Sequence, residues 1–268
     1  RMAAHAIKAG EGDVFVAAGV ETVSRYVNGM ADTGPHNPMF ADAEARTKDL
    51  SNGADSWEPF PGLPDVYIAM GQTAENVRLK EGVTRQEMDE FAARSQQLAV
   101  ANQENGFWEA EITPITTPSG TVVTKDDGPR PGTTVEKLAE LKPAFRPDGE
   151  VTAGNACPLN DGAAAVVVMS DTKARELGIT PLARVVASGV SGLNPEIMGL
   201  GPIEASRQAL NRAGMTIDDI DLVEINEAFA AQVIPSARHL GIPIEKLNVK
   251  GGAIALGHPF GMTGARMK

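Results

Sequence analysis

Two short segments in the last fifth of the chain combine side chains that could move a proton or stabilise a charged oxygen. The first is the tetrad NEAF at residues 226–229, between an expected strand at residues 222–225 and an expected helix at residues 227–240. The second is residues 251–264, where five glycines surround His258. Histidine titrates near neutral pH, and glycine lets backbone approach a bound group closely. Ligands of α/β folds lie at such strand-to-helix junctions, so both segments are candidates for one site.

Each candidate also has a purely structural interpretation. Asn226 could do no more than cap the helix that follows it, because Asn is among the commonest N-cap residues. His258 could be a structural histidine, although its position between Gly257 and Pro259, at a junction of strand and helix, favours catalysis. The pattern alone leaves both alternatives open.

The elements that must position these residues follow the alternation of a layered α/β domain. The expected strands are residues 13–19, 163–169, 182–188, 222–225 and 247–249. The expected helices are residues 2–7, 85–105, 135–141, 171–177, 202–213 and 227–240. Residues 163–169 are continuously apolar, which predicts a strand buried on both faces. A long stretch between about residues 28 and 160 interrupts the alternation and indicates an insertion into the scaffold.

Composition narrows the class of protein. The 35 acidic and 24 basic residues give a formal charge of −11, which argues against nucleic acid or an anionic membrane as a main partner. A single cysteine, Cys157, excludes an internal disulfide and fits a reducing compartment such as the cytoplasm. The longest aliphatic run, residues 163–169, is too short to insert into a membrane. Four histidines and one cysteine show no metal-ligand spacing, so we expect no metal site.

NEAF at residues 226–229, followed by GHPFGMTG at residues 257–264, resembles two of the three signature blocks of the thiolase family in the same order. The resemblance extends over essentially the whole chain. Further similar segments are residues 19–25, 70–76, 154–162 and 198–202. It implies an α/β, layered αβαβα fold, with two similar core domains and a loop-domain insertion, truncated at both ends.

The resemblance also implies a division of the chain. Residues 1–28 and 160–180 would form part of the N-terminal core domain, and residues 29–159 the loop domain that covers coenzyme A. Residues 181–268 would form part of the C-terminal core domain. Both cysteines that the family uses in catalysis are expected outside this sequence, one upstream of Arg1 and one beyond Lys268.

The activity implied by the resemblance is acyl-CoA C-acyltransfer, namely cleavage of 3-oxoacyl-CoA by coenzyme A or the reverse Claisen condensation, through an acyl-cysteine. His258 would activate the nucleophilic cysteine and help bind the thioester oxygen, and Asn226 would hold a water that completes the oxyanion site. Coenzyme A would be substrate and product, with no permanently bound cofactor.

Further residues are implied to contact the coenzyme or the acyl group. Cys157 stands where many members have a serine that binds the pantetheine chain, and Arg130 lies near the nucleotide end. The other implied contacts are Met70, Phe145, Ala153, Met198, Ala228 and Phe229. Ala69 stands where acetoacetyl-CoA-handling members carry histidine, which favours a longer or bulkier acyl group and a degradative role in fatty acid β-oxidation.

There are three alternatives to a degradative thiolase. A biosynthetic thiolase that forms acetoacetyl-CoA belongs to the same family. A ketoacyl synthase is disfavoured, because such enzymes generally use two histidines and Asn226 stands where one of them would be. A non-catalytic acyl-CoA-binding fragment is the alternative of another class, because both catalytic cysteines are absent. The resemblance further implies a homodimer or homotetramer.

Overall fold

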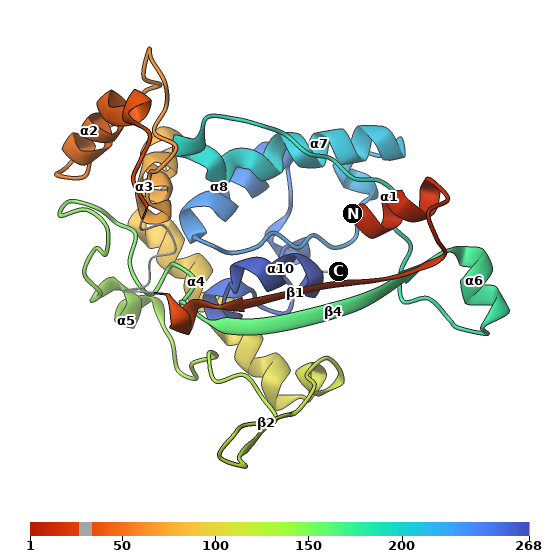
Figure 1. The fold of residues 1–268 in the computed structure, drawn as a ribbon. Helices are drawn as coiled ribbons and strands as arrows, with labels where there is room; N and C mark the ends of the chain where they lie inside the picture. Colours follow the sequence, from red (N-terminus) through yellow and green to blue (C-terminus); the bar gives the residue numbers. More distant parts are fainter. Residues whose placement is uncertain (27–33, 268) are drawn as a thin grey trace.

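The scaffold of the chain is a long antiparallel ribbon of two strands that are far apart in sequence. The computed structural model describes residues 1–26 and 34–267. After helix α1 (Met2–Lys8), strand β1 (Val14–Thr22) pairs along its whole length with strand β4 (Asp161–Met169). Figure 1 shows the two strands side by side, with helix α10 (Phe260–Arg266) lying against them. The stretch between β1 and β4 therefore leaves the ribbon and returns to it.

One face of the ribbon is covered and the other is open. Burial alternates along both strands, and the outward side chains include Val16 at 68% exposure and Val167 at 60%. The predicted strand at residues 163–169 is thus correct, but its predicted burial on both faces is wrong, because α10 covers one face only. The helix approaches closely at Gly19, where a Cβ atom would lie 1.8 Å from the carbonyl oxygen of Gly261.

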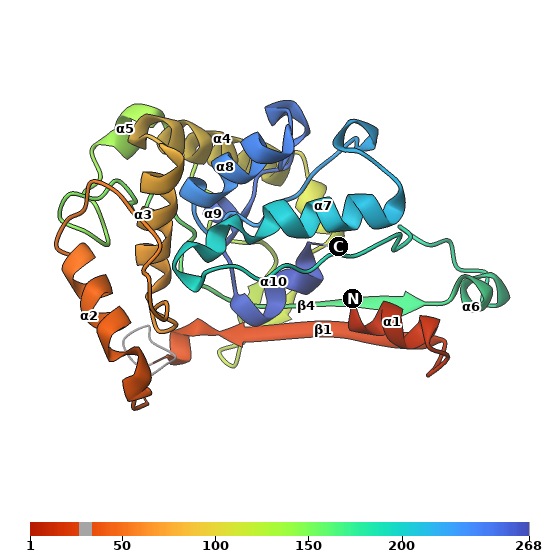
Figure 2. The same cartoon turned by 90° about the horizontal axis from the view of Figure 1, so that it is seen from above.

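A group of helices lies on the α10 side of the ribbon, as Figure 2 shows from above. They are α3 (Met70–Glu81), α4 (Arg85–Glu104), α7 (Gly201–Ala213) and α8 (Ala230–Leu240). Their apolar residues meet in one core that includes the fully buried Val77, Met88 and Val233. The sequence predicted the start of α4 correctly, since Thr84 and Glu87 form a reciprocal capping box there. The α7 prediction is also confirmed, with Gly214 ending the helix in a left-handed conformation.

The remaining elements are short. They are α2 (Ala41–Leu50), β2 (Ile115–Thr116), β3 (Val122–Val123), α5 (Val135–Ala139), α6 (Asp171–Glu176) and α9 (Ala253–Leu256). Within the described ranges, no helix has both the length and the apolar character that crossing a membrane requires.

Three predicted strands of the C-terminal portion do not form as such. Residues 182–188 have no strand structure, and Val185 is 49% exposed. Residues 222–225 and 247–249 meet only in an isolated parallel bridge between Val223 and Leu247. A strand needs a hydrogen-bonded neighbour along its length, and apolar residues alone do not supply one. The predictions of these three strands are therefore wrong apart from the single bridge, and Asn248 adopts a left-handed conformation at φ +45°.

Candidate functional site

The junction before α8 leaves Asn226 with an unusual environment. The helix begins at Ala230 with Phe229 at its N-cap, three residues later than the sequence predicted, so the capping interpretation of Asn226 is wrong. Gln232 on the first turn donates a hydrogen bond of 2.7 Å to the backbone carbonyl of Asn226 and fixes the turn. The side-chain oxygen of Asn226 is buried and has no hydrogen-bond partner among the described residues. A buried acceptor of this kind is suited to a water or ligand donor.

A buried carboxylate ties this junction to the glycine-rich segment. Glu227 is fully buried and accepts hydrogen bonds from the Ser95 hydroxyl (2.6 Å), the Asn248 side-chain amide (2.8 Å) and the Ile254 backbone N–H (3.1 Å). Burial raises the pKa of Glu227 above its usual value, although these hydrogen bonds oppose the shift. A Cβ atom on Gly252 would lie 2.2 Å from the Glu227 carboxyl carbon, so glycine is required there. Glu227, the residue after Asn226, thus holds the backbone of Ile254, four residues before His258.

His258 is half-buried and held at one ring nitrogen. Its Nδ1 lies 2.7 Å from the hydroxyl oxygen of Thr263, and its ring meets that of Phe260 edge to face at 5.3 Å. Burial lowers the pKa of His258, and the nearby positive charge of Arg266 lowers it further. The imidazole is therefore neutral at pH 7 and able to accept a proton.

The segment that contains Cys157 is bound directly to the NEAF tetrad. The backbone N–H of Cys157 donates to the carbonyl of Ala228 (2.9 Å), and the N–H of Ala230 donates to the carbonyl of Asn155 (2.9 Å). Burial raises the pKa of the Cys157 thiol to about 11. A thiol with that pKa is almost wholly protonated at neutral pH, which makes Cys157 a poor nucleophile.

A cavity of about 480 Å³ opens beside this segment. Its wall includes Arg130, Lys137 and Asp127 at the polar side and Ala153, Pro158 and Ile254 among the small and apolar residues. Asn160 also lines the cavity; its side-chain oxygen is buried, and within the described ranges it meets no donor.

One residue of the cavity wall, Asn160, lies against the segment that carries His258. A Cβ atom on Gly257 would be 2.2 Å from the Asn160 oxygen, so the residue before His258 packs directly on that amide. Gln96 links the opposite wall, because it accepts from the Arg130 N–H (2.8 Å) and donates to the Ile254 carbonyl (3.3 Å). The cavity wall thus contains both cationic side chains and the amide of Asn160, on which the residue before His258 packs.

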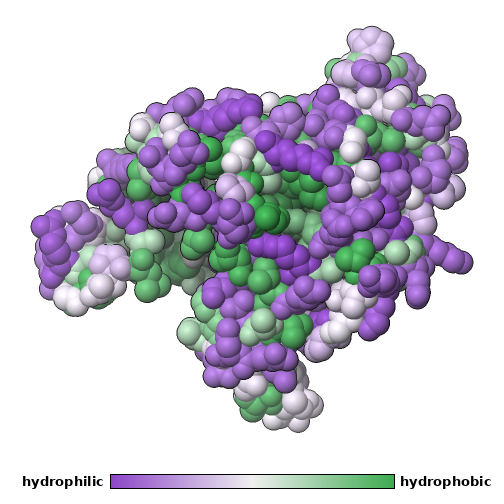
Figure 3. Space-filling model, turned by 180° about the vertical axis from the view of Figure 1, so that it is seen from behind, coloured by the Kyte–Doolittle hydropathy of each residue, from purple (hydrophilic) through white to green (hydrophobic). Residues whose placement is uncertain are grey.

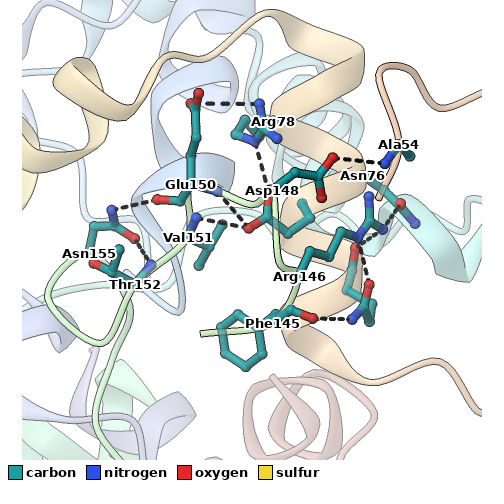
Figure 4. A network of polar contacts seen from close by, with 12 residues as sticks. Ala54, Asn76, Arg78, Phe145, Arg146, Asp148, Glu150, Val151, Thr152 and Asn155 are labelled. Atoms are coloured by element: carbon teal, nitrogen blue, oxygen red, sulfur yellow. Dashed lines mark hydrogen bonds and ion pairs between the residues drawn. The ribbon is translucent and has the colours of Figure 1, made fainter. Parts of the chain in front are cut away.

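The loop before Cys157 is anchored to α3 by charged groups, as Figure 4 shows. The buried Glu75 accepts from the backbone N–H groups of Glu150 (3.0 Å) and Val151 (2.9 Å). Arg146 is 4% exposed and donates to Gln72 (2.7 Å) and Asn76 (2.6 Å). These contacts fix the backbone beside Arg146. They thereby position Phe145, which belongs to the apolar part of the site.

The predicted apolar contact residues form two small groups. Phe145 stacks edge to face on Phe229 at 5.9 Å, and Gly71, next to Met70, could not carry a Cβ without lying 2.1 Å from the Phe145 ring. Met198 precedes Gly199, where a Cβ would lie 2.7 Å from Gln232. Met70 and Met198 are about half exposed, at 48% and 47%. Figure 3 shows one face hollowed near its middle, with hydrophobic residues gathered there among polar surroundings.

Several residues of this region have no counterpart among the sequence-predicted ones. They are Ser95, Gln96, Asn160, Glu227, Gln232, Asn248 and Thr263. Glu227 and Thr263 lie inside the two blocks at residues 226–229 and 257–264, and Asn160 lies three residues after Cys157. Nearness in sequence to these candidate residues is therefore the signal that could identify them. The described residues contain no group of three or more His, Cys, Asp or Glu side chains placed to hold a metal ion.

Comparison with known families defines the class of protein. Residues 1–172 match the family model "Thiolase, N-terminal domain", and residues 179–268 match "Thiolase, C-terminal domain". The chain belongs to the thiolase family, and its fold is the α/β thiolase fold. It is 48% identical to an acetyl-CoA acetyltransferase of Pseudomonas aeruginosa over 272 residues, and 45% identical to a probable acetyl-CoA acyltransferase of Staphylococcus aureus over 275 residues. These alignments cover 99% and 100% of the chain and 67% of each relative.

Solved structures agree with that classification. The dimeric peroxisomal thiolase of Saccharomyces cerevisiae superposes with a TM-score of 0.86 at 39% identity, covering 98% of this chain and 63% of the yeast protein. The acetyl-CoA acetyltransferase of Bacillus anthracis superposes with a TM-score of 0.80 at 42% identity, covering 99% and 66%. The chain thus spans about two thirds of the length of the relatives that it matches.

Proposed function

We propose that this chain supplies the acid–base and coenzyme-binding part of an acyl-CoA C-acyltransferase that cleaves 3-oxoacyl-CoA with coenzyme A or runs the reverse condensation. His258 is the base, and Asn226 holds the water of the oxyanion site. The nucleophilic cysteine and the second proton-transferring cysteine belong to sequence outside these 268 residues, since Cys157 is the single cysteine here and its pKa is raised to about 11.

The proposed cleavage begins when the nucleophilic thiol gives its proton to His258. The thiolate adds to the 3-oxo carbonyl, the bond between C2 and C3 breaks, and the acyl group stays on the cysteine. The departing acetyl-CoA enolate carries its charge on the thioester oxygen, where fixed hydrogen-bond donors stabilise it. The second cysteine protonates the enolate carbon, and the thiol of coenzyme A then takes the acyl group from the first cysteine.

The observation that carries the proposal is the hydrogen-bonded carboxylate of Glu227. It binds the junction of Asn226 to the backbone before His258 through the Ile254 N–H at 3.1 Å. An unpaired amide oxygen and a neutral imidazole are thereby supported by one rigid connection. A long, flexible substrate would approach the histidine from the cavity of about 480 Å³, because Asn160 in its wall packs against Gly257.

The binding roles follow from the cavity. Arg130 and Lys137 in the cavity wall are the cations available for phosphate groups. Ala153, also in the wall, and Cys157, the residue before the wall residue Pro158, would flank the path of the pantetheine chain. Met70, Phe145, Met198, Ala228 and Phe229 would surround the acyl end. Ala69 is exposed beside the half-exposed Met70, which is consistent with room for an acyl group longer than acetoacetyl.

Cleavage of 3-oxoacyl-CoA by the full-length enzyme tests the proposal. His258→Ala should lower kcat by about 10²-fold or more, the range expected for loss of a general base. Asn226→Ala should lower it by about 10²-fold, as for loss of one oxyanion donor. His239→Ala is the matched control, because His239 is a surface histidine paired with Glu81 at 2.8 Å and should leave kcat unchanged. Full activity of His258→Ala would refute the mechanism.

An acetoacetyl-CoA-forming thiolase is the second candidate, because two of the relatives reported above are named acetyl-CoA acetyltransferases. Kinetics with 3-oxoacyl-CoA substrates of increasing chain length separate the two. A preference for longer substrates supports the degradative role in fatty acid breakdown, and a preference for acetoacetyl-CoA refutes it. Homo-oligomerisation, as in the yeast relative described as dimeric, and a cytoplasmic location belong to the same proposal.

A further inference from the structure

We propose that Thr263 is a positioning residue that fixes the tautomer of His258, so that the neutral imidazole carries its proton on Nδ1 and leaves Nε2 free as the base. This inference rests on the proposed role of His258. It adds a residue whose hydroxyl touches the histidine but not the substrate.

The geometry consists of two consecutive hydrogen bonds. The Thr263 hydroxyl oxygen lies 2.7 Å from Nδ1 of His258 and 3.0 Å from the carbonyl oxygen of Pro259. Thr263 is only 5% exposed, so bulk water has little access to compete for either contact. Both contacts lie within helix α10 and the residues that lead into it.

The position of the hydroxyl hydrogen decides the tautomer. If that hydrogen pointed at Nδ1, the oxygens of Thr263 and Pro259 would face each other at 3.0 Å with no hydrogen between them, and their lone pairs would repel. If it points at Pro259, the hydroxyl oxygen becomes an acceptor and Nδ1 must be the donor. The second arrangement places a hydrogen in each contact and is therefore favoured. It leaves Nε2 with its lone pair exposed.

The same helix keeps the ring neutral. Arg266, one turn after Thr263, donates a hydrogen bond of 2.9 Å to the carbonyl of Gly257, and its charge lowers the pKa of His258. The positive charge disfavours a second proton on the ring. The ring is therefore neutral before the nucleophilic thiol transfers its proton. Asp126, Glu224 and Glu227 interact electrostatically with Arg266, and burial raises the pKa of each of these three carboxyl groups.

The consequence for the reaction is a defined proton path. The nucleophilic thiol transfers its proton to Nε2, which gives a thiolate and an imidazolium, while the other ring proton stays on Nδ1 and donates to the Thr263 hydroxyl oxygen. The new Nε2–H then points at the thioester oxygen and can donate to it. With the ring fixed in this orientation, Nε2 acts first as a base and then as a hydrogen-bond donor. The other tautomer would offer no lone pair at Nε2.

Nitrogen NMR of the histidine side chains tests the tautomer without reference to activity. The 268-residue chain has four histidines, so labelling them with ¹⁵N gives few resonances, and His258→Gln identifies the one required. We expect the protonated, pyrrole-type nitrogen of neutral His258 to be Nδ1 in the unsubstituted protein and in Thr263→Ser. In Thr263→Val, which keeps the shape and removes the hydroxyl, we expect a mixture of tautomers. An Nε2–H tautomer in the unsubstituted protein, or an unchanged Nδ1–H tautomer in Thr263→Val, would overturn the inference.

The pH profile of kcat in the full-length enzyme adds a second readout. Thr263→Val should lower kcat by about tenfold or more through loss of the competent tautomer, with KM little changed, and Thr263→Ser should restore it. If His258→Ala were fully active while the tautomer was as expected, the proposed function and the positioning role for catalysis would both fail, and only the assignment of the tautomer to Thr263 would stand. If His258→Ala were inactive and Thr263→Val kept normal kcat and its pH profile, the positioning role would fail.

Discussion

Two asparagine environments within one small region contrast sharply. Asn248 is fully buried and uses both ends of its amide, since Oδ1 accepts from the Ile225 N–H at 2.8 Å while the NH₂ group donates to the Ile225 carbonyl and to Glu227, each at 2.8 Å. Asn226, two residues before Ala228, has a buried oxygen with no protein donor in the described part of the chain. The Asn248 amide therefore joins segments of the fold through its hydrogen bonds. The Asn226 oxygen remains available to a water or a ligand.

The difference distinguishes side chains that stabilise the fold from side chains that are available to bind a ligand. Buried polar atoms in native proteins are paired as a rule, so an unpaired one marks either strain or a ligand position. The unpaired oxygens of Asn160 and Asn226 lie close to the junctions that carry His258 and Cys157, and the fully paired Glu227 and Asn248 lie behind them. A hydrogen-bonded network therefore supports a few unpaired groups, of which the Asn160 oxygen belongs to the cavity wall.

The largest effect is expected from removing the carboxylate at the centre of the scaffold. Glu227→Ala leaves the Ser95 hydroxyl, the Asn248 amide and the Ile254 N–H without their acceptor. Each buried donor left unpaired costs about 1–3 kcal/mol, so the free energy of unfolding should fall by about 4 kcal/mol in urea denaturation.

Two variants sharpen that prediction. Glu227→Gln keeps one acceptor oxygen and should lose about half as much stability. Glu245→Ala removes an exposed carboxylate and should change stability by less than about 0.5 kcal/mol. Equal stability of Glu227→Ala and the unsubstituted protein would show that the central network does not support the fold.

The asparagine pair gives the next largest effect and tests the comparison directly. Asn248→Ala should cost about 3 kcal/mol, because it orphans the Ile225 backbone groups and places alanine at φ +45°. Asn226→Ala should cost less than about 1 kcal/mol, because its buried oxygen makes no protein hydrogen bond within the described residues. Thermal or urea unfolding of the two variants in parallel measures both. A larger loss for Asn226→Ala than for Asn248→Ala would reverse the contrast.

Local signals in the sequence predicted much of the fold. The capping box at Thr84, the glycine after α7 and the helix at the N-terminal end each depend on neighbouring residues and are confirmed. The pairing of β1 with β4 depends on residues far apart, and the sequence suggested only an interrupted scaffold. The strand expected at residues 182–188 shows the limit, because an apolar run predicts extended backbone but says nothing of its hydrogen-bonded neighbour.

The site was predicted unevenly for a similar reason. The sequence identified His258 and Asn226 as candidates, because their side chains can transfer a proton or form hydrogen bonds. The sequence pattern does not predict which atom of each side chain has a hydrogen-bond partner. Asn248 and Glu227 look like ordinary polar residues until their burial and their shared hydrogen bond of 2.8 Å are known. Polar groups that act by supporting others leave no periodic signal in the sequence, because their partners come from distant segments.

The smallest expected effect concerns the reactivity of the half-buried thiol of Cys157. Raising its pKa from 9.0 to about 11 lowers the thiolate fraction at pH 7.5. Greater nucleophilicity of the more basic thiolate offsets part of that loss, so alkylation by iodoacetamide should be slower than for an unhindered cysteine by about tenfold. Mass spectrometry of the intact chain measures the rate at a single position, because no other cysteine is present in these 268 residues. The rate should rise towards that of free cysteine in denaturing urea, and fast alkylation of the folded chain would show instead that the thiol is activated.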